Sequence, residues 1–275
     1  MLAYPNAKIN IGLHIVARRP DGYHDLETVF YPIPLQDALE TRPLRGSNAP
    51  FALQIVGLEV GGRPEDNLVV KVCEDLRAEF GFPPQDIWLD KHIPMGAGLG
   101  GGSSDAATMM RLLNDVYDLG LSPEDMERRL AGYGADCAFF VRQRAAYATG
   151  IGDRLSPIDL SLRGLAIILV KPPVSVSTRE AYAGVSPQQP EVDLREALSR
   201  PVETWRDCVI NDFEASVFPQ HPEIAAIKDT LYDMGALYAA MSGSGSTVYG
   251  LFHHELEEAP RVFQDCFVFQ RILRL

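Results

Sequence analysis

A glycine-rich segment in the first half of the chain constrains the fold more than any other feature of the sequence. Five glycines lie within Gly96–Gly102, and Ser103 and Ser104 follow them. Each glycine is costly to order, by about 1 kcal/mol relative to alanine in a helix. A strand pattern precedes the segment and a helix pattern follows it. The segment is therefore predicted to be an ordered loop that opens a helix.

The composition of this loop is typical of a phosphate-binding site. Backbone N–H groups without neighbouring Cβ atoms can approach an anion closely, and a helix N-terminus favours negative charge. The loop is not a Walker A motif, because no lysine followed by serine or threonine closes it. Gly96, Gly98 and Gly101 satisfy the spacing of a dinucleotide-binding fingerprint, but the strand, helix and acid-ended strand of that site do not follow. An NAD site and a glycine turn without a ligand stay as alternatives.

The chain is long enough for two domains. It has 275 residues, of which 46% are hydrophobic, and single hydrophobic cores stop growing at about 250–300 residues. The hydrophobic pattern loosens over residues 150–162, where Pro157 lies. We predict an α+β protein with an N-terminal domain of residues 1–156 and a C-terminal domain of residues 157–275.

Hydrophobic periodicity predicts the elements of both domains. The expected strands cover residues 8–16, 26–33, 51–56, 87–93, 165–171, 237–241 and 247–252 and a segment near Phe267. The expected helices cover residues 66–80, with Asp66 as N-cap, the segment after the glycine loop, a segment that begins at Ser122, and several segments between Thr178 and Asp233.

Composition and charge exclude several functional classes. The net charge of -12 opposes extended contact with nucleic acid or an anionic membrane. No run approaches the ~20 apolar residues of a membrane helix, and polar residues interrupt the first apolar stretch, so we expect a cytoplasmic protein without a signal peptide. The cysteines lack C-x-x-C spacing and are expected to be reduced thiols: Cys73, Cys137, Cys208 and Cys266. No metal site is expected, because His92, His253 and His254 are typical surface residues.

Three separated parts of the chain resemble the GHMP kinases. They are Pro5–Asn10 with Asp21–His24, then Pro94–Ala107, then Met241–Thr247. Shorter matches extend along nearly the whole chain and include Asp66–Leu68, Gly134–Asp136, Gly150–Asp153, Val176–Thr178 and Asn211–Glu214. The resemblance implies the GHMP kinase fold, with an N-terminal domain like the second domain of ribosomal protein S5 and a ferredoxin-like C-terminal domain. It also implies transfer of the γ-phosphate of ATP, with Mg²⁺, to a hydroxyl group of a cytidine diphosphate-linked polyol.

The resemblance assigns ATP to the glycine loop. The implied ATP-binding residues are Pro94, Met95, Gly96, Ala97, Gly98, Leu99, Gly100, Gly101, Gly102, Ser103 and Ser104, together with Asn67 and Lys91. Asn67 is equally a helix-start residue. Mg²⁺ is expected to rest on phosphate oxygens, waters and Ser104, because the sequence contains no dedicated carboxylate cage.

Lys8 and Asp136 are the predicted catalytic residues. An unpaired ammonium on a buried strand is costly, so Lys8 needs a carboxylate or a phosphate. The resemblance implies that Asp136 accepts the proton of the acceptor hydroxyl and that Lys8 pairs with this carboxylate. From the residues alone, Asp136 is as well explained by a turn, and Lys8 by an edge strand that faces water.

The implied substrate residues surround a cytosine ring and the transferred phosphate. His24 reads the cytosine edge, Tyr23 and Tyr182 sandwich the ring, and Asn10 and Thr178 lie nearby. A second backbone nest consists of Gly243, Ser244 and Gly245. Without the resemblance, the Tyr23–His24 pair is typical of a surface turn and the second nest of a hairpin turn.

Other readings of the same motifs stay open. A GHMP kinase that acts on mevalonate, homoserine or a sugar has the same glycine loop. A catalytically inactive nucleotide-binding module is a further alternative, but Lys8 and Asp136 are both present. The expected partners are small molecules, and a monomer or homodimer is expected.

Overall fold

The computed structural model describes residues 1–46 and 48–274. These residues form two compact units, and neither unit is continuous in sequence. The first unit consists of Met1–Ala7, Leu35–Met95 and Gly100–Arg144. The second unit consists of Lys8–Pro34, Gly96–Leu99 and the chain from Ala145 onward.

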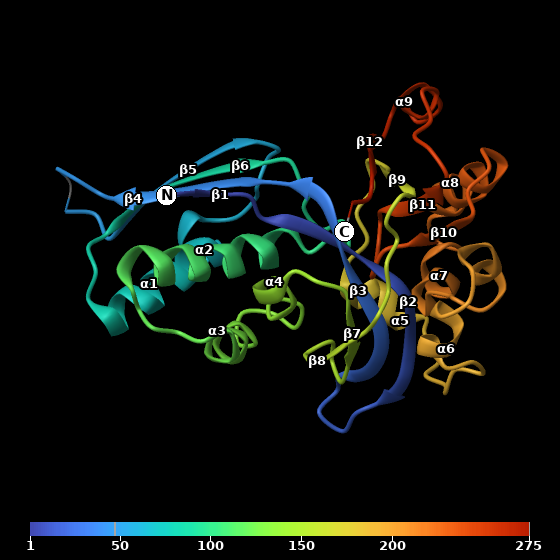
Figure 1. Ribbon diagram of the computed structural model, residues 1–275, viewed down its shortest axis with the longest axis horizontal. Helices are drawn as coiled ribbons and strands as arrows, with labels where there is room; N and C mark the ends of the chain where they lie inside the picture. Colours follow the sequence, from blue (N-terminus) through green and yellow to red (C-terminus); the bar gives the residue numbers. More distant parts are fainter. Residues whose placement is uncertain (47, 275) are drawn as a thin grey trace. The chain divides into compact units, whose positions relative to one another are not determined.

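The first unit contains a four-stranded sheet with helices packed against it. The strand order is β1 (Leu2–Ala3), β4 (Ala38–Pro43), β6 (Gln85–Lys91) and β5 (Phe51–Gly57). Strand β5 runs parallel to β6, and the other two pairs are antiparallel. Helices α1 (Leu68–Phe80) and α2 (Gly101–Tyr117) lie side by side below this sheet in Figure 1 and contact its strands. The apolar faces of both helices therefore share one core with the sheet.

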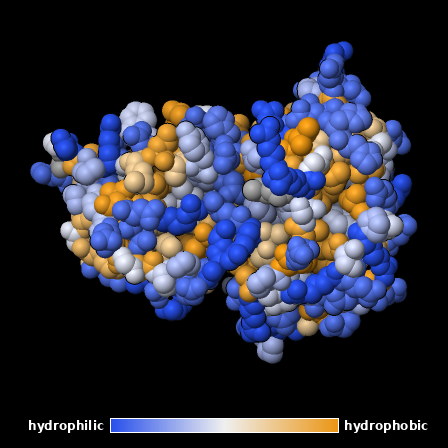
Figure 2. All heavy atoms as spheres, viewed as in Figure 1, coloured by the Kyte–Doolittle hydropathy of each residue, from blue (hydrophilic) through white to orange (hydrophobic). Residues whose placement is uncertain are grey.

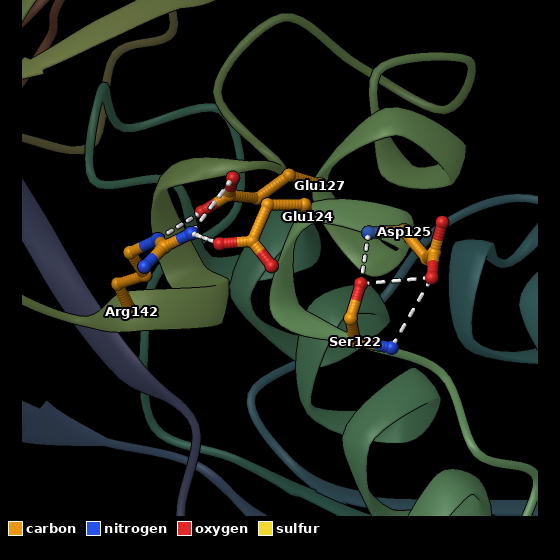
Figure 3. A network of polar contacts seen from close by, with 5 residues as sticks. All are labelled: Ser122, Glu124, Asp125, Glu127 and Arg142. Atoms are coloured by element: carbon orange, nitrogen blue, oxygen red, sulfur yellow. Dashed lines mark hydrogen bonds and ion pairs between the residues drawn. The ribbon is translucent and has the colours of Figure 1, made fainter.

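Two short helices of the first unit fix the loop that carries Asp136. Helix α3 (Pro123–Leu130) begins with a capping box, in which Ser122 accepts from the Asp125 N–H (3.1 Å) and the Asp125 carboxylate accepts from Ser122. Arg142, the last residue of α4 (Phe139–Arg142), pairs with Glu124 and Glu127 of α3 at 2.5 Å each (Figure 3). The segment between these helices is thus held at both ends.

The second unit contains two four-stranded sheets. One has the order β2 (Asn6–Arg18), β3 (His24–Gln36), β7 (Ala146–Thr149) and β8 (Arg154–Pro157), with the ends of β2 and β3 reaching into the first unit. The other is antiparallel and has the order β10 (Tyr238–Met241), β11 (Val248–Phe252), β9 (Ala166–Lys171) and β12 (Phe267–Ile272). Its helices are α5 (Thr178–Ala183), α6 (Leu194–Leu198), α7 (Asp212–Val217), α8 (Pro222–Asp233) and α9 (Ala259–Val262). Helix α8 packs against β10 and β11, so this sheet is covered by buried side chains such as Ile224 and Leu231.

The surface is that of a protein with its apolar side chains mostly inside. On the face drawn in Figure 2, hydrophobic residues are scattered among hydrophilic ones over both units. In the part of the chain that the structure describes, no helix has both the length and the apolar character that a membrane crossing requires. All four cysteines carry free thiols.

The predicted strands and long helices are present, with two differences. The N-cap of α1 is Asn67, whose side chain accepts from the Val69 N–H, and not Asp66, which lies in the preceding 3-10 turn Pro64–Asp66. Strand β4 and the short strands β1, β7 and β8 were not predicted. After α2 the chain enters α3, so within the described residues the glycine loop is not followed by the parallel strand that a dinucleotide site needs.

The compact units do not follow a single cut along the chain. The β2–β3 segment and β7 belong to the predicted N-terminal domain, yet they lie in the second unit together with the chain beyond residue 157. The compact units are thus a different division of the chain, and the domain boundary between residues 156 and 157 stays a prediction.

Candidate active site

The glycine loop adopts a backbone that requires glycine. Gly96, Gly98 and Gly100 have φ values of 57°, 75° and 71°, in the left-handed region that other residues rarely adopt. A Cβ at Gly98 would lie 2.0 Å from the backbone oxygen of Ser242. The loop therefore passes directly against the Ser242–Ser246 loop, as only glycine allows.

The start of α2 is shaped for an anion. The N-cap is Gly100, and no side chain of a described residue caps it. A Cβ at Gly101 would lie 2.9 Å from Ile93, whereas Gly102 has open space in that direction. The first-turn N–H groups of a helix lack intrahelical partners and carry the positive end of the helix dipole. The predicted phosphate-binding loop thus opens a helix as expected.

A cavity of about 150 Å³ lies beside this helix start. It brings together four of the residues predicted to bind the nucleotide, namely Asn67, Lys91, Met95 and Gly102. Val60, Gly61, Arg63, Asp66, Leu68, Leu89 and Asp105 complete its lining. All of these residues belong to the first unit.

Lys91 is buried at the base of this cavity between two carboxylates. It is 1% exposed, and its Nζ donates to Asp37 (2.5 Å) and Asp105 (2.7 Å). The other Asp37 oxygen accepts from the N–H groups of His92 (2.6 Å) and Ile93 (2.8 Å). Burial raises the pKa of Asp105 to about 7, against the opposing charge of Lys91. We did not assign Asp37 or Asp105 from sequence, because nothing local indicates that they share one lysine.

Lys8 is oriented by neutral acceptors in the second unit. It is 4% exposed on β2, so the alternative of an edge-strand lysine in water is wrong. Its Nζ donates to Asn10 Oδ1 (2.6 Å) and to the Gly98 carbonyl oxygen (3.0 Å), and it lies 5.1 Å from the centre of the Phe30 ring. The Lys8 backbone N–H donates to Leu99 (3.0 Å). The strand and the glycine loop are therefore joined at this residue.

Asn10 connects Lys8 to Thr28, which the sequence did not single out, and to Ser242 of the second glycine loop. Its Nδ2 donates to Thr28 Oγ1 (3.0 Å), and its backbone N–H donates to Ser242 Oγ (3.1 Å). Both ends of the carboxamide are thus engaged within the protein. This geometry makes Asn10 a residue that orients Lys8.

Asp136 lies in the first unit, in the segment between α3 and α4. Its Oδ1 accepts from Ser103 Oγ (2.8 Å), which stands in the first turn of α2. Burial raises the pKa of the neighbouring Cys137 thiol to about 12, so this thiol is protonated at neutral pH. The hydrogen bond from Ser103 connects the Asp136 carboxylate to α2, the helix that begins at the glycine loop. Its pairing with Lys8, which belongs to the second unit, stays a prediction.

Two of the predicted cytidine residues, His24 and Tyr182, belong to an aromatic cluster in the second unit. His24 stacks on Tyr182, with ring centres 4.7 Å apart and planes 19° apart. The rings of Tyr182 and Phe213 are nearly perpendicular, with their centres 4.8 Å apart. Tyr23 is 61% exposed, and Thr178 is exposed at the start of α5. The cluster thus joins His24 to Tyr182 directly, and Phe213 is a member that the sequence did not indicate.

The second glycine loop connects β10 to β11 and is anchored on several sides. Gly243 and Gly245 have φ values of 56° and 90°. Ser242 Oγ donates to the Gly98 carbonyl oxygen (2.8 Å), and Ser246 Oγ donates to the Val174 carbonyl oxygen (2.6 Å). The loop is therefore a hairpin connection that also packs against the first glycine loop.

Comparisons with known proteins give one consistent result. The family model for the GHMP kinases N terminal domain matches residues 67–144, and the model for the GHMP kinases C terminal domain matches residues 194–267. A protein of Bacteroides fragilis named 4-diphosphocytidyl-2-C-methyl-D-erythritol kinase is 55% identical over 274 residues, which cover 100% of both chains. A protein of the same name from Bacteroides thetaiotaomicron is 56% identical over 255 residues, 93% of each chain.

Solved structures agree with these relatives. The crystal structure of a 4-(cytidine 5'-diphospho)-2C-methyl-D-erythritol kinase has a TM-score of 0.81 and 30% identity, and the match covers 98% of each chain. The mevalonate kinase of Methanococcus jannaschii has a TM-score of 0.70 at 12% identity, over 100% of this chain and 98% of that one. At that identity the likeness shows the fold alone.

Proposed function

This chain belongs to the GHMP kinase family, and we propose that it transfers the γ-phosphate of ATP to the 2-hydroxyl of 4-(cytidine 5'-diphospho)-2-C-methyl-D-erythritol. The products would be the 2-phosphate and ADP, a step of the non-mevalonate pathway to isoprenoid precursors. The predicted α+β fold of the family is confirmed. The observation that carries the choice of substrate is the 55% identity, over the whole chain, to a relative with that name.

The helix start and the cavity of the first unit suit the ATP side of this reaction. Phosphoryl transfer depends on positioning and on balancing charge at the transferred group. We assign the phosphates to the first-turn N–H groups of α2 and the adenosine to the cavity beside Asn67 and Met95. Both features lie at the N-terminal end of α2, where the helix dipole favours the anion.

Mg²⁺ enters this proposal as part of the co-substrate. Among the described residues no group of three histidine, cysteine or acidic side chains is arranged to hold a metal ion. Ser104, which was expected near the ion, is fully buried, so its hydroxyl is a poor ligand. We therefore assign the ion to phosphate oxygens and water, which is the usual mode for Mg²⁺.

Asp136 and Lys8 suit the acceptor side. Ser103 fixes one oxygen of the Asp136 carboxylate, which would accept the proton of the acceptor hydroxyl. Lys8 Nζ donates to Asn10 Oδ1 and to the Gly98 carbonyl oxygen, and these two hydrogen bonds orient the ammonium. The ammonium is then able to stabilise the oxygen that attacks phosphorus.

The aromatic cluster suits the cytidine moiety. The imidazole of His24 can both donate and accept hydrogen bonds, as the edge of cytosine requires. The ring of Tyr182 stacks on this imidazole and fixes its plane. Support for this assignment comes from the contact between these two residues, which lie far apart in the sequence.

Mg²⁺-dependent ADP release tests the proposal. The acceptors are 4-(cytidine 5'-diphospho)-2-C-methyl-D-erythritol, mevalonate, homoserine and galactose, each with wild type and Asp136→Asn. We expect turnover with the cytidine compound alone and a loss of at least about 100-fold in the variant. The matched control is Asp75→Asn, an aspartate that accepts from the Tyr133 hydroxyl in the same unit and should keep wild-type activity.

Each other outcome has a defined meaning. Turnover with a different acceptor alone would keep the kinase family and overturn the substrate. No ADP release with any acceptor would favour the catalytically inactive nucleotide-binding module.

A further inference from the structure

The segment Asn211–Glu214 carries contacts that the proposed reaction does not use. It matched the family in sequence without a role, and it forms the N-cap and first turn of α7. We propose that Asn211 is a positioning residue, which holds the Ser242–Ser246 loop in the geometry needed for phosphoryl transfer. The inference rests on the proposed function, because it names a further residue of that site.

The Asn211 side chain makes more contacts than helix capping requires. Its Oδ1 accepts from the Phe213 N–H (3.0 Å), which is the capping bond. Its Nδ2 donates to the carbonyl oxygens of Met241 and Gly243, both at 2.8 Å. Serine or aspartate caps a helix equally well through an oxygen alone. The two N–H donors, which only an amide supplies here, are therefore explained by the loop and not by the helix.

The two carbonyls bound by Asn211 belong to Met241 and Gly243, the residues on either side of Ser242. Ser242 connects the second glycine loop to the first glycine loop and to Asn10. Ser242 Oγ donates to the Gly98 carbonyl oxygen (2.8 Å) and accepts from the Asn10 N–H (3.1 Å). The same Gly98 oxygen accepts from Lys8 Nζ (3.0 Å). A chain of hydrogen bonds within the second unit therefore leads from Asn211 through Ser242 to the predicted catalytic lysine.

The other residues of the segment give Asn211 a rigid base. Asp212 accepts from the Ile15 N–H of β2 (2.7 Å), and the Phe213 ring packs perpendicular to that of Tyr182. Glu214 accepts from the Met241 N–H (2.8 Å) and from Lys228 (2.5 Å). Asn211 itself is 4% exposed. The side chain that holds the Ser242–Ser246 loop thus stands at a helix start that contacts β2, β10 and the aromatic cluster.

The variant Asn211→Ser separates the two roles, because serine keeps an oxygen for the cap and loses both N–H donors. A displacement of about 1 Å at a reacting group costs about 100-fold in rate. We expect kcat with the cytidine substrate to fall between about tenfold and 100-fold, with both KM values within about threefold of wild type. The control Asp193→Ser changes the N-cap of α6 and should leave kcat unchanged.

Hydrogen exchange without substrates gives a second readout. In Asn211→Ser, amides of Ser242–Ser246 should exchange faster than in wild type, while those of α7 exchange as before. Unchanged kcat and unchanged exchange in the loop would overturn the inference. Equally faster exchange throughout α7 would also overturn it, since the residue would then act through the helix. If wild type fails to phosphorylate the cytidine substrate, the proposed function fails, and the exchange experiment still decides whether Asn211 holds the loop.

Discussion

Two hydrogen bonds orient the ammonium of Lys8, one to Asn10 Oδ1 and one to the Gly98 carbonyl oxygen. Lys8→Met keeps an unbranched side chain that ends at Cε and removes the charged Nζ. We expect kcat to fall by about 10²–10³-fold, because charge stabilisation in the transition state is lost, while the KM for ATP changes little. Steady-state kinetics with varied ATP measures both values.

The control for this variant is Lys71→Met, on the exposed side of α1. The Lys71 side chain is 46% exposed. The turnover of the Lys71→Met variant should therefore equal that of wild type. Near-normal turnover of Lys8→Met in a folded protein would show that the lysine has no part in the chemistry.

Asp105 should make stability depend on pH. Its folded-state pKa of about 7 lies above the ordinary value of 3.8, chiefly because burial disfavours the charged form. Between about pH 4 and pH 7 the folded protein therefore binds more protons than the unfolded chain, and its stability falls as pH rises through this window. Asp105→Asn cannot ionise, so the Tm of the variant relative to wild type should be higher at pH 8 than at pH 5.

Thermal unfolding at these two pH values measures the difference. Asp115→Asn, on the exposed side of the same helix, is the control, and its Tm difference from wild type should not depend on pH. A pH-independent difference for Asp105→Asn as well would contradict the raised pKa.

At the scale of elements, α3 depends on its cap. Ser122 accepts from the Asp125 N–H and stands just before the helix whose Glu124 and Glu127 hold Arg142 (Figure 3). Ser122→Ala should lower stability by about 1 kcal/mol, which is about 2–4 °C in Tm for a chain of this size. Thermal unfolding checks this value. Ser199→Ala, at an exposed serine after α6, should change stability by less than about 0.5 kcal/mol, and an equal loss in both variants would argue against the cap.

Local patterns predicted the elements where the periodicity was long. The long segments β2 and α2 show it, and the glycine loop between β6 and α2 has the required left-handed residues. Strands β7 and β8 have four residues each and were not predicted, because such short runs carry little periodicity. Strand β7 pairs with β3, which lies far away in the sequence, and β8 pairs with β7.

The site residues also fall into two groups, those that the local sequence identified and those whose roles depend on distant partners. Lys8 and the glycine loop were identified because their residue types are unusual in a strand or at a helix start. Asp37 and Asn211 were not assigned roles, because each acts through partners more than 25 residues away, Lys91 for one and Gly243 for the other. An isolated aspartate or asparagine beside a helix or strand is too common for sequence to distinguish it.

At the scale of the whole molecule, the two substrates are assigned to different units. The cavity beside Asn67 and Lys91 lies in the first unit, whereas the stacked pair His24 and Tyr182 lies in the second. Bound ligand slows local opening only where it adds contacts. ADP should therefore protect amides of α1 near Asn67 from hydrogen exchange, and CDP should protect those around His24 and Tyr182.

Exchange measured with each nucleotide alone, in wild type and in His24→Ala, decides this assignment. The variant should lose the protection by CDP and keep the protection by ADP, since it removes a ring of the cytidine cluster and leaves the cavity lining intact. Its KM for the cytidine substrate should rise at least about tenfold, while the KM for ATP stays within about twofold. Protection of the His24 segment by ADP, or equal rises in both KM values, would mean that the two units do not divide the substrates as assigned. The stacked pair would then be part of the protein core and not the cytidine site.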